Sequence, residues 1–249
     1  MPTYTFTPSI LRGAGTRAVP AIPAGSSFTN NFSLNFDGTD DLVSAGNVLG
    51  FERTDAFSIS AWVKRNSSKN QMIVSKRLSS GNLTGYSLRI TNSTNQLQVQ
   101  LRSAGSNRLI LNGSTALDTN WNHVVLTYDG SSNISGLNVY VNGSNDNGST
   151  TGTLSLSILN SAEFNIGAEN NNDDFFDGNI DEVALFNSEL SSTNVSTIYN
   201  SGIPGDLSSL SPLSWYRFEE GSGTTATDSG TGGNNGTISG ATYSSNIPA

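Results

Sequence analysis

Short runs in which apolar and polar side chains alternate recur along most of this chain, and they restrict its fold more than any other feature. Leu97, Val99 and Leu101, for example, alternate with glutamines. A strand that packs one face on a core and turns the other outward has this period of two. Runs of this kind lie at 32–36, 57–63, 97–102, 124–128, 137–141, 154–158 and 164–166. The sequence therefore predicts an all-β protein in which two antiparallel sheets pack face to face.

Two local signals interrupt the strand pattern. Asn142-Gly143 follows the run at 137–141 and predicts a type I′ hairpin turn, because both central residues of that turn need a positive φ. After Leu190 the period changes, and a single short helix is predicted to begin at a Ser191 or Ser192 cap and to end at Gly202. We expect this helix to close one rim of the sandwich.

Composition and charge exclude several classes of function. The 249 residues contain no cysteine, which removes disulfide scaffolds, thiolate metal sites and cysteine nucleophiles. No stretch reaches the roughly 18 apolar residues of a membrane span, and residues 1–25 do not resemble a signal peptide. The net charge is −8, and no aromatic residues interleave with the basic ones. We therefore expect neither a membrane nor nucleic acid as a partner.

Basic residues are concentrated in the first part of the chain. Residues 1–108 hold eleven of the twelve lysines and arginines and only five of the twenty acids. One cluster surrounds what the pattern predicts to be a single hairpin, and its members are Lys64, Arg65, Lys69, Lys76 and Arg77. This cluster is either a solvated strand pair or a surface that contacts the acidic part of another copy of the chain.

Residues 1–27 differ from the rest of the chain. Glycines and prolines interrupt any regular pattern there, and several large apolar side chains have no local core. We therefore interpret 1–27 as an extended N-terminal arm that docks on a neighbouring chain, for example by adding a strand to a sheet edge. The predicted docking residues are Tyr4, Phe6, Ile10 and Leu11.

Six ordered motifs carry a resemblance to a known family. They lie at 33–41 (SLNFDGTDD), 57–63 (FSISAWV), 121–129 (WNHVVLTYD), 139–143 (VYVNG), 178–183 (GNIDEV) and in the predicted helix at 190–199. Together they resemble laminin-G-like domains of the concanavalin A-like lectin and glucanase superfamily, over residues 28–249. The resemblance implies a jelly-roll sandwich, with glycans as candidate ligands and calcium as the candidate cofactor.

The order of the motifs departs from the family. Residues 213–228 and 235–243 resemble the opening of such a domain, although they stand near the end of this sequence. Either a second copy is cut off, or, as we expect, the domain is circularly permuted and 213–249 complete the same sandwich. The strand near 237–243 should then lie in one sandwich with the strand near 32–36.

Permuted domains with a short arm are similar to structural proteins of tailed bacteriophages. This resemblance implies a non-catalytic protein of the virion surface, either a capsid decoration or a fibre or tail module, which binds other virion proteins or its own copies and contacts host glycans. A secreted carbohydrate-binding module, or an accessory domain of a polysaccharide-processing enzyme, is the alternative, and its location would be extracellular. A free-standing calcium-dependent adhesin is a third possibility.

The sequence offers no arrangement of known glucanase type. Such enzymes place two carboxylates on alternate residues of one strand, and no two of the twenty acids are spaced in this way. Asp181-Glu182 are adjacent, so a regular strand would turn them to opposite faces. His123 is the single histidine and is expected to be hydrogen-bonded inside the sandwich. We therefore predict no catalytic residue.

Candidate binding residues fall in two places. Trp62 lies on the polar side of its strand, where it could stack on a sugar, unless a loop, the arm or the helix covers it, whereas Trp121 and Trp215 are expected in the core. The second place is a loop rich in amide and acidic side chains, which is either a solvated loop or the rim of a ligand or calcium site. Its candidates are Asn172, Asp173, Asp174 and Asp177, the three aspartates being the metal candidates. Asp37, Asp40 and Asp41 are interpreted as a turn.

Overall fold

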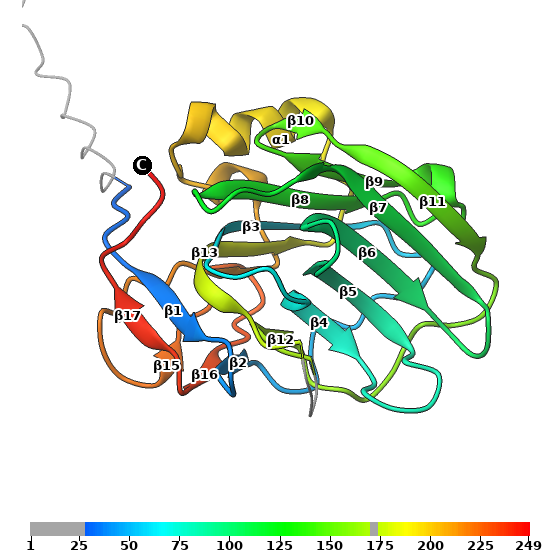
Figure 1. The fold of residues 1–249 in the computed structure, drawn as a ribbon, viewed down its shortest axis with the longest axis horizontal. Coiled ribbons are helices and arrows are strands. Elements are labelled where there is room, and N and C mark those ends of the chain that lie inside the picture. The colour runs from blue at the N-terminus through cyan, green and yellow to red at the C-terminus, as the bar shows by residue number, and fades with distance from the viewer. Residues whose placement is uncertain (1–27, 170–173) are drawn as a thin grey trace, which may run out of the picture.

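The computed structural model describes residues 28–169 and 174–249, and it confirms the all-β sandwich (Figure 1). Two antiparallel sheets pack on one another, and one α-helix, α1 (Ser192–Tyr199), lies outside them. Three short 3₁₀ helices are η1 (Ile134–Gly136), η2 (Asn200–Gly202) and η3 (Ser208–Leu210). No helix in these two ranges is long and apolar enough to span a membrane. The arm residues Tyr4, Phe6, Ile10 and Leu11 lie outside the described residues.

The first sheet has eight strands. Their order is β10-β9-β8-β3-β13-β1-β17, and β14 pairs with β13 beside this path. The strands are β1 (Ser33–Asp37), β3 (Phe57–Arg65), β8 (Asn122–Tyr128), β9 (Leu137–Val141), β10 (Ser144–Asn145), β13 (Asp177–Phe186), β14 (Ser214–Tyr216) and β17 (Thr242–Ser244).

The second sheet has nine strands in the order β11-β7-β6-β5-β4-β12-β2-β16-β15. They are β2 (Leu42–Ser44), β4 (Gln71–Arg77), β5 (Gly85–Ile90), β6 (Gln96–Arg102), β7 (Arg108–Ala116), β11 (Asn147–Thr153), β12 (Asn165–Ile166), β15 (Thr225–Ala226) and β16 (Gly236–Ser239).

The main core fills the space between the two sheets, and the apolar members of the alternating runs supply it. The predicted strand at 154–158 is instead a loop. Its Leu154 and Ile158 are buried as expected, but the Asn107 Oδ1 atom accepts hydrogen bonds from the backbone amides of Ser155 and Leu156, at 2.9 and 3.0 Å. A side chain therefore satisfies amides that a strand ladder would otherwise pair.

The C-terminal segment completes both sheets. β17 pairs with β1, with Tyr243 opposite Leu34, and β16 pairs with β2 in the other sheet. The expected proximity of 237–243 to 32–36 is therefore present, and Figure 1 shows the red and blue strands side by side. Trp215 of β14 is buried as expected, whereas Trp121 is half-buried and its Nε1 donates to the Asn246 side chain at 3.2 Å.

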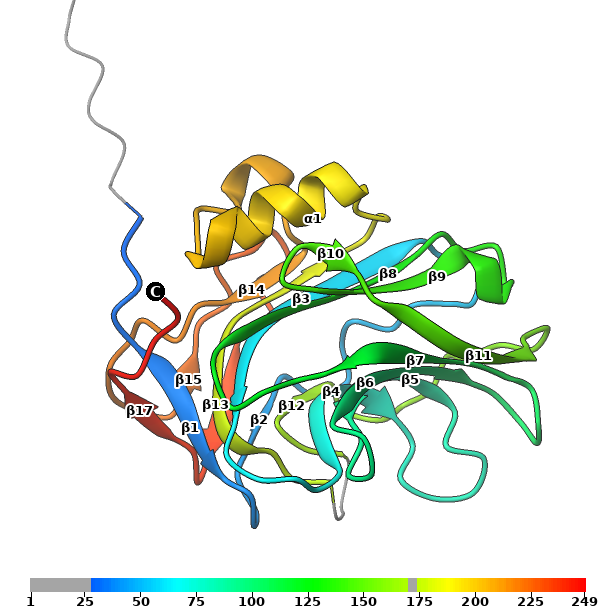
Figure 2. The ribbon, with the colours of Figure 1, turned by 45° about the horizontal axis from the view of Figure 1, so that its top comes forward.

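The helix begins where the sequence predicts and ends earlier. Ser191 and Asn194 form a reciprocal capping box, whereas the left-handed C-cap is Asn200 rather than Gly202. The helix also lies on a face and not at a rim (Figure 2). Val195 and Ile198 pack on the outer side of the eight-stranded sheet against Val125, Phe186 and other residues of a second apolar cluster.

The basic cluster is not a hairpin, because β3 and β4 belong to different sheets. The segment between them crosses the edge of the sandwich. Its charges also have partners within the chain: Lys76 turns inward onto the Asn47 side chain, and Arg65 donates to the carbonyl of Leu117. These contacts make Arg65 and Lys76 part of the fold, and contact of the cluster with another copy stays a prediction.

Candidate ligand-binding face

The outward side of the nine-stranded sheet carries polar side chains where β4, β5, β6 and β7 run side by side. Because Leu97, Val99 and Leu101 of β6 enter the core, its intervening residues turn away from it. We call the outward residues of these four strands the polar face. Its polar members are Ser75, Arg77, Ser87, Arg89, Gln98, Gln100, Arg102, Arg108 and Asn112, and two apolar residues, Met72 and Ile110, lie among them.

Strand register arranges the polar face in three rows across the sheet, because antiparallel partners point to the same side. The rows are Met72, Arg89, Gln98 and Asn112; then Ser75, Ser87, Gln100 and Ile110; then Arg102 and Arg108. Arg77 lies beside the third row, at the end of β4.

Two glutamines of β6 connect the rows by hydrogen bonds. Gln98 accepts from Arg89 Nε at 2.9 Å and donates to Asn112 Oδ1 at 2.7 Å. Gln100 Oε1 accepts from Arg77 Nη1 and from Arg102 Nη1, both at 3.2 Å. Each guanidinium is thereby fixed in direction, and a ligand on this face would lose less side-chain entropy when it binds.

Two carboxylates balance part of the positive charge. Glu169 pairs with Arg77 at 2.5 Å, and Asp174 pairs with Arg89 at 3.0 Å. Burial lowers the pKa of Arg102, and the nearby charges of Arg108, Arg77 and Arg89 lower it further. The four guanidiniums therefore lie close enough to repel one another.

Two hydroxyl groups in the middle row lack partners. Ser75 and Ser87 are fully buried and face each other across β4 and β5, and neither Oγ has a hydrogen-bond partner among the described residues. Buried polar atoms are normally satisfied by protein or by water. Both hydroxyls lie beneath the longer side chains of the face, out of reach of solvent.

The same side of the sheet is hollowed farther along, over β2 and β16. A depression of about 490 Å³ opens there, lined by Ser44, Glu163, Thr237, Ser239 and neighbouring residues. Ser44 Oγ donates to Glu163 Oε2 at 2.7 Å. Polar groups therefore continue from the four arginine-bearing strands toward the edge of the sheet.

Trp62 does not fit the ligand role expected for it. Its side chain is only 3% exposed, and it packs against the rings of His123 and Tyr199, whose centroids lie 5.0 and 6.0 Å from its own and which also contact each other. Tyr199 belongs to α1, so the helix covers the ring, as the alternative interpretation allowed. No face of Trp62 is open to a sugar.

The loop candidates are only partly described. Asn172 and Asp173 lie outside the described residues. Asp174 pairs with Arg89 beside the polar face, whereas Asp177 opens β13 and lies opposite Asp37 of β1. Because a guanidinium already holds the Asp174 carboxylate, that group does not fit a calcium site.

Asp37, Asp40 and Asp41 have carboxylate oxygens within 4.8 Å of one another, but their contacts are those of a turn. Asp41 Oδ2 accepts from the Asp37 amide and Asp37 Oδ1 accepts from the Thr39 amide, both at 2.8 Å. Burial raises the pKa of Asp41. Oxygens that already serve the loop's own amides do not fit the coordination that calcium needs.

Titratable groups with unusual pKa values gather on the other sheet, under α1. His123 accepts or donates a hydrogen bond at Ser60 Oγ, 2.8 Å from its Nε2, and burial lowers its pKa to about 3. Its Nδ1 has no partner among the described residues, so the third member of a catalytic triad is not in place.

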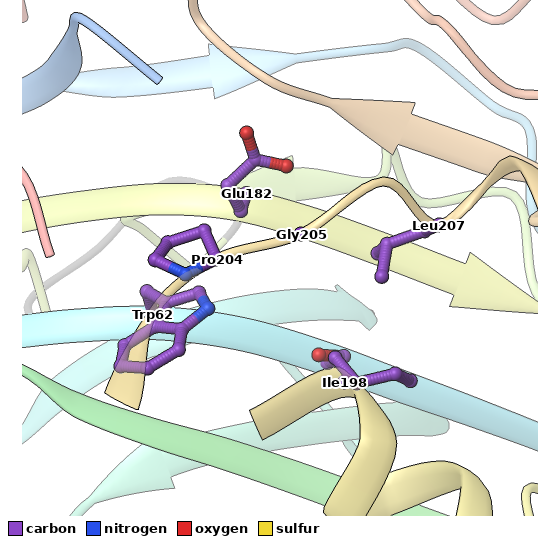
Figure 3. A pocket seen from close by; sticks show the side chains of 7 residues that line it. Trp62, Glu182, Ile198, Pro204, Gly205 and Leu207 are labelled. Carbon is purple, nitrogen blue, oxygen red and sulfur yellow. The ribbon is translucent and has the colours of Figure 1, made fainter. Parts of the chain in front are cut away.

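Asp181 and Glu182 do not point to opposite faces of β13, as a regular strand would require. A bulge between Asp181 and Ala184 gives Glu182 a φ of 49° and sends both acids to the side away from the main core. Glu182 accepts from Trp215 Nε1 at 2.6 Å, and burial raises its pKa to about 8. Figure 3 shows Glu182, Trp62 and Ile198 around a narrow space that has no room for a water molecule.

These sheets, the single outer helix and the polar outward face define the class of lectin-like β-sandwiches. Within that class, residues 37–196 match the family model described as the concanavalin A-like lectin/glucanases superfamily, a laminin G family. The match covers more than half of the chain, and the chain therefore belongs to this superfamily. No curated protein matches it.

Two solved structures illustrate the similarity. A candidate carbohydrate-binding protein from Bacteroides ovatus is 20% identical, with a TM-score of 0.62 over 89% of this chain and 62% of that one. A heptameric SAP-like pentraxin from Limulus polyphemus is 17% identical, with a TM-score of 0.53 over 68% of this chain and 82% of that one. At these identities the likeness shows the fold alone. The chain spans less than two thirds of the Bacteroides protein.

The polar face is the part of the site that the sequence interpretation missed. Alternation did turn Gln98, Gln100 and Arg102 outward, but one strand alone cannot show which residues lie beside it. Register with β5 and β7 brings Arg89 and Arg108 to the same side. Long polar side chains at alternate positions of neighbouring strands were the available signal.

Proposed function

We propose that this chain is a non-catalytic glycan-binding module whose ligand lies on the polar face. The observation that carries the proposal is the set of amides and guanidiniums that Gln98 and Gln100 hold in fixed directions on this face. Sugars present donors and acceptors around a ring, and sites that orient such ligands use a few well-placed polar groups. Membership in a superfamily that contains lectins supports this proposal.

The absence of catalysis is part of the proposal, because the superfamily also contains glucanases. Support comes from the surroundings of the titratable groups. His123 is buried beneath Trp62 and Tyr199, and the Glu182 carboxylate is occupied by Trp215 in a space without room for water. Hydrolysis needs water at the reacting carboxylates.

We further propose that the module serves on a virion surface, as a capsid decoration or as a fibre or tail module, and docks there through the 1–27 arm. The support is the resemblance of an arm followed by a permuted domain to tailed-phage structural proteins, together with the pairing of β17 with β1. A secreted carbohydrate-binding module is the alternative, and the two differ in whether the chain is found in particles.

A glycan array with the purified chain tests the binding role. We expect the wild-type chain to bind and Gln98→Ala to bind at least tenfold more weakly. The change removes the amide that holds Arg89 and Asn112, and loss of such hydrogen bonds costs roughly 1–3 kcal/mol. Asn133→Ala, an exposed amide on a distant loop, is the matched control and should bind normally. A silent array contradicts glycan binding, and full binding by Gln98→Ala places the ligand elsewhere.

Deletion of residues 2–25 tests the docking role. The shortened chain should keep its melting temperature but disappear from purified particles, as measured by immunoblotting of particles assembled with it. The quadruple change of Tyr4, Phe6, Ile10 and Leu11 to serine should have the same effect, because it removes the apolar contacts and keeps the length. Normal incorporation of both variants would refute the docking role.

A further inference from the structure

We infer that the polar face recognises an acidic polysaccharide, and that Arg102 and Arg108 bind its carboxylate or sulfate group. This inference deepens the glycan-binding function proposed above and depends on it. The argument concerns the charges on the face, the direction of the arginine side chains and the groups beside them.

Arg102 and Arg108 are direct cross-strand partners on β6 and β7. Partners on one face have Cβ atoms only about 5 Å apart, and like charges in such a pair destabilise the sheet. Neither arginine forms an ion pair within the described parts of the chain, since Glu169 is engaged by Arg77 and Asp174 by Arg89. The nearby charge of Glu169 offsets the repulsion in part, but no carboxylate of the described residues pairs directly with either arginine.

Arg102 is also held in a direction that leaves a donor unused. Its Nη1 is fixed on Gln100, while its Nε is buried and has no hydrogen-bond partner among the described residues. A carboxylate or sulfate accepts two parallel bonds from one guanidinium and attracts a second guanidinium nearby. The lowered pKa of Arg102 reflects the same unfavourable surroundings, which an anion would reverse.

The sign of the face differs from that of the whole molecule. Among the residues that the structure describes, four guanidiniums and two paired carboxylates leave a local excess of positive charge in a chain of net charge −8. A neutral sugar would not require this excess. Because the net charge of the chain is negative, this concentration of arginines favours an acidic ligand on the polar face over most of the remaining surface.

The groups next to the arginine pair fit a sugar better than a simple anion. The row that contains Ser75, Ser87 and Gln100 lies two residues along the strands, which is about 7 Å away. An acidic sugar can thus place its charged group on Arg102 and Arg108 and extend its ring along the face toward Gln98 and Asn112. An inorganic anion or an acidic peptide side chain would contact the arginine pair alone.

Titration calorimetry with matched hexasaccharides tests the inference. Three probes are acidic: a hexamer of alternating glucuronic acid and N-acetylglucosamine, a hexamer of galacturonic acid, and a sulfated dextran oligomer. Two probes are neutral: the N-acetylglucosamine hexamer and unmodified dextran. We expect at least one acidic probe to bind ten or more times as tightly as its neutral counterpart, and the sulfated and carboxylated arms show which anion is preferred. This affinity should fall as salt is raised.

Variants locate the charge. Arg108→Gln should reduce the affinity for the acidic hexamers at least tenfold. Arg102→Lys should reduce that affinity less, because lysine keeps the charge but loses the planar guanidinium. Arg53→Gln, which removes an equal charge beside Ser132, should have no effect. Unchanged melting temperatures show that the variants are folded. Since Arg108 forms no hydrogen bond or ion pair with the other described side chains, its replacement is the safer of the two.

The outcomes separate the two proposals. One outcome would overturn the inference and leave glycan binding intact: the acidic and neutral hexamers bind equally well, Gln98→Ala weakens this binding, and Arg108→Gln does not. If polyglutamate binds as tightly as the acidic hexamers, the face recognises any polyanion rather than an acidic sugar, and the inference is also overturned. Binding of no saccharide at all would refute both.

Discussion

Burial decides what the chemically active side chains of this protein can do. Trp62, His123 and Glu182 belong to the residue types most often found in binding and catalytic sites, yet all three are enclosed beneath α1. Desolvation favours the uncharged form of each titratable group, which lowers the pKa of His123 and raises that of Glu182. On the polar face, Arg89, Arg102 and Arg108 are only partly buried, whereas Arg77 is buried and pairs with Glu169.

The buried Glu182 makes stability depend on pH. Its pKa is about 8 in the folded chain, against an ordinary value of 4.5, so between these values the folded state holds a proton that the unfolded state has lost. The stabilisation that the protonated Glu182 gives to the folded state is therefore complete below pH 4.5 and is lost as the pH rises through 8. The free energy of unfolding falls by up to about 1.4 kcal/mol per pH unit over this range. Glu182→Gln should flatten the decline in the free energy of unfolding between pH 5 and 8, as measured by urea denaturation.

Asp181 remains in that variant, and burial raises its pKa too, so the decline should shrink but not vanish. Glu52→Gln is the control. The pKa of Glu52 is lowered by hydrogen bonds from Ser157 and two backbone amides, which places its effect below pH 4.5. An unaltered slope in Glu182→Gln would show that this carboxyl group is ionised in the folded chain.

The conformation of individual turns and helix ends is set by adjacent residues, but the register and contacts of a strand are not. The Asn142-Gly143 turn has the expected positive φ values of 49° and 77°, and Ser191 caps the helix as predicted. Both depend on a few adjacent residues. The bulge in β13, in contrast, arises because Ile180 and Val183 both enter the core although they are three residues apart. The regular alternation expected of a strand does not predict this register shift.

At the scale of the whole molecule, the last 37 residues belong to the same cooperative unit as the first strands. Residues 213–249 supply β14 and β17 to one sheet and β15 and β16 to the other, and Tyr216, Phe218 and Ile238 enter the main core. The end of the chain at Ala249 lies near the start of β1 (Figure 1). One edge of each sheet, at β17 and at β15, is therefore formed by this C-terminal segment, far in sequence from the strands that it pairs with.

A chain that ends at residue 212 should lose its cooperative thermal transition, because it leaves the core open and the edges of β1 and β2 unpaired. A rearranged chain, in which 213–249 precede 28–212 through a short glycine-rich linker, should melt within a few degrees of the original. Circular dichroism and size-exclusion chromatography measure both. A stably folded, monomeric 1–212 would contradict the single-unit architecture.

The sequence by itself determined the all-β class, most strands, the helix start and the family, because alternation, caps and turns depend on neighbouring residues. It also placed Gln98, Gln100 and Arg102 on the outward side of their strand. Only the tertiary structure decided that α1 covers Trp62, that β3 and β4 lie in separate sheets, and that Arg108 stands opposite Arg102. Those facts depend on strand register and on packing between distant segments, which the pattern of one strand does not encode.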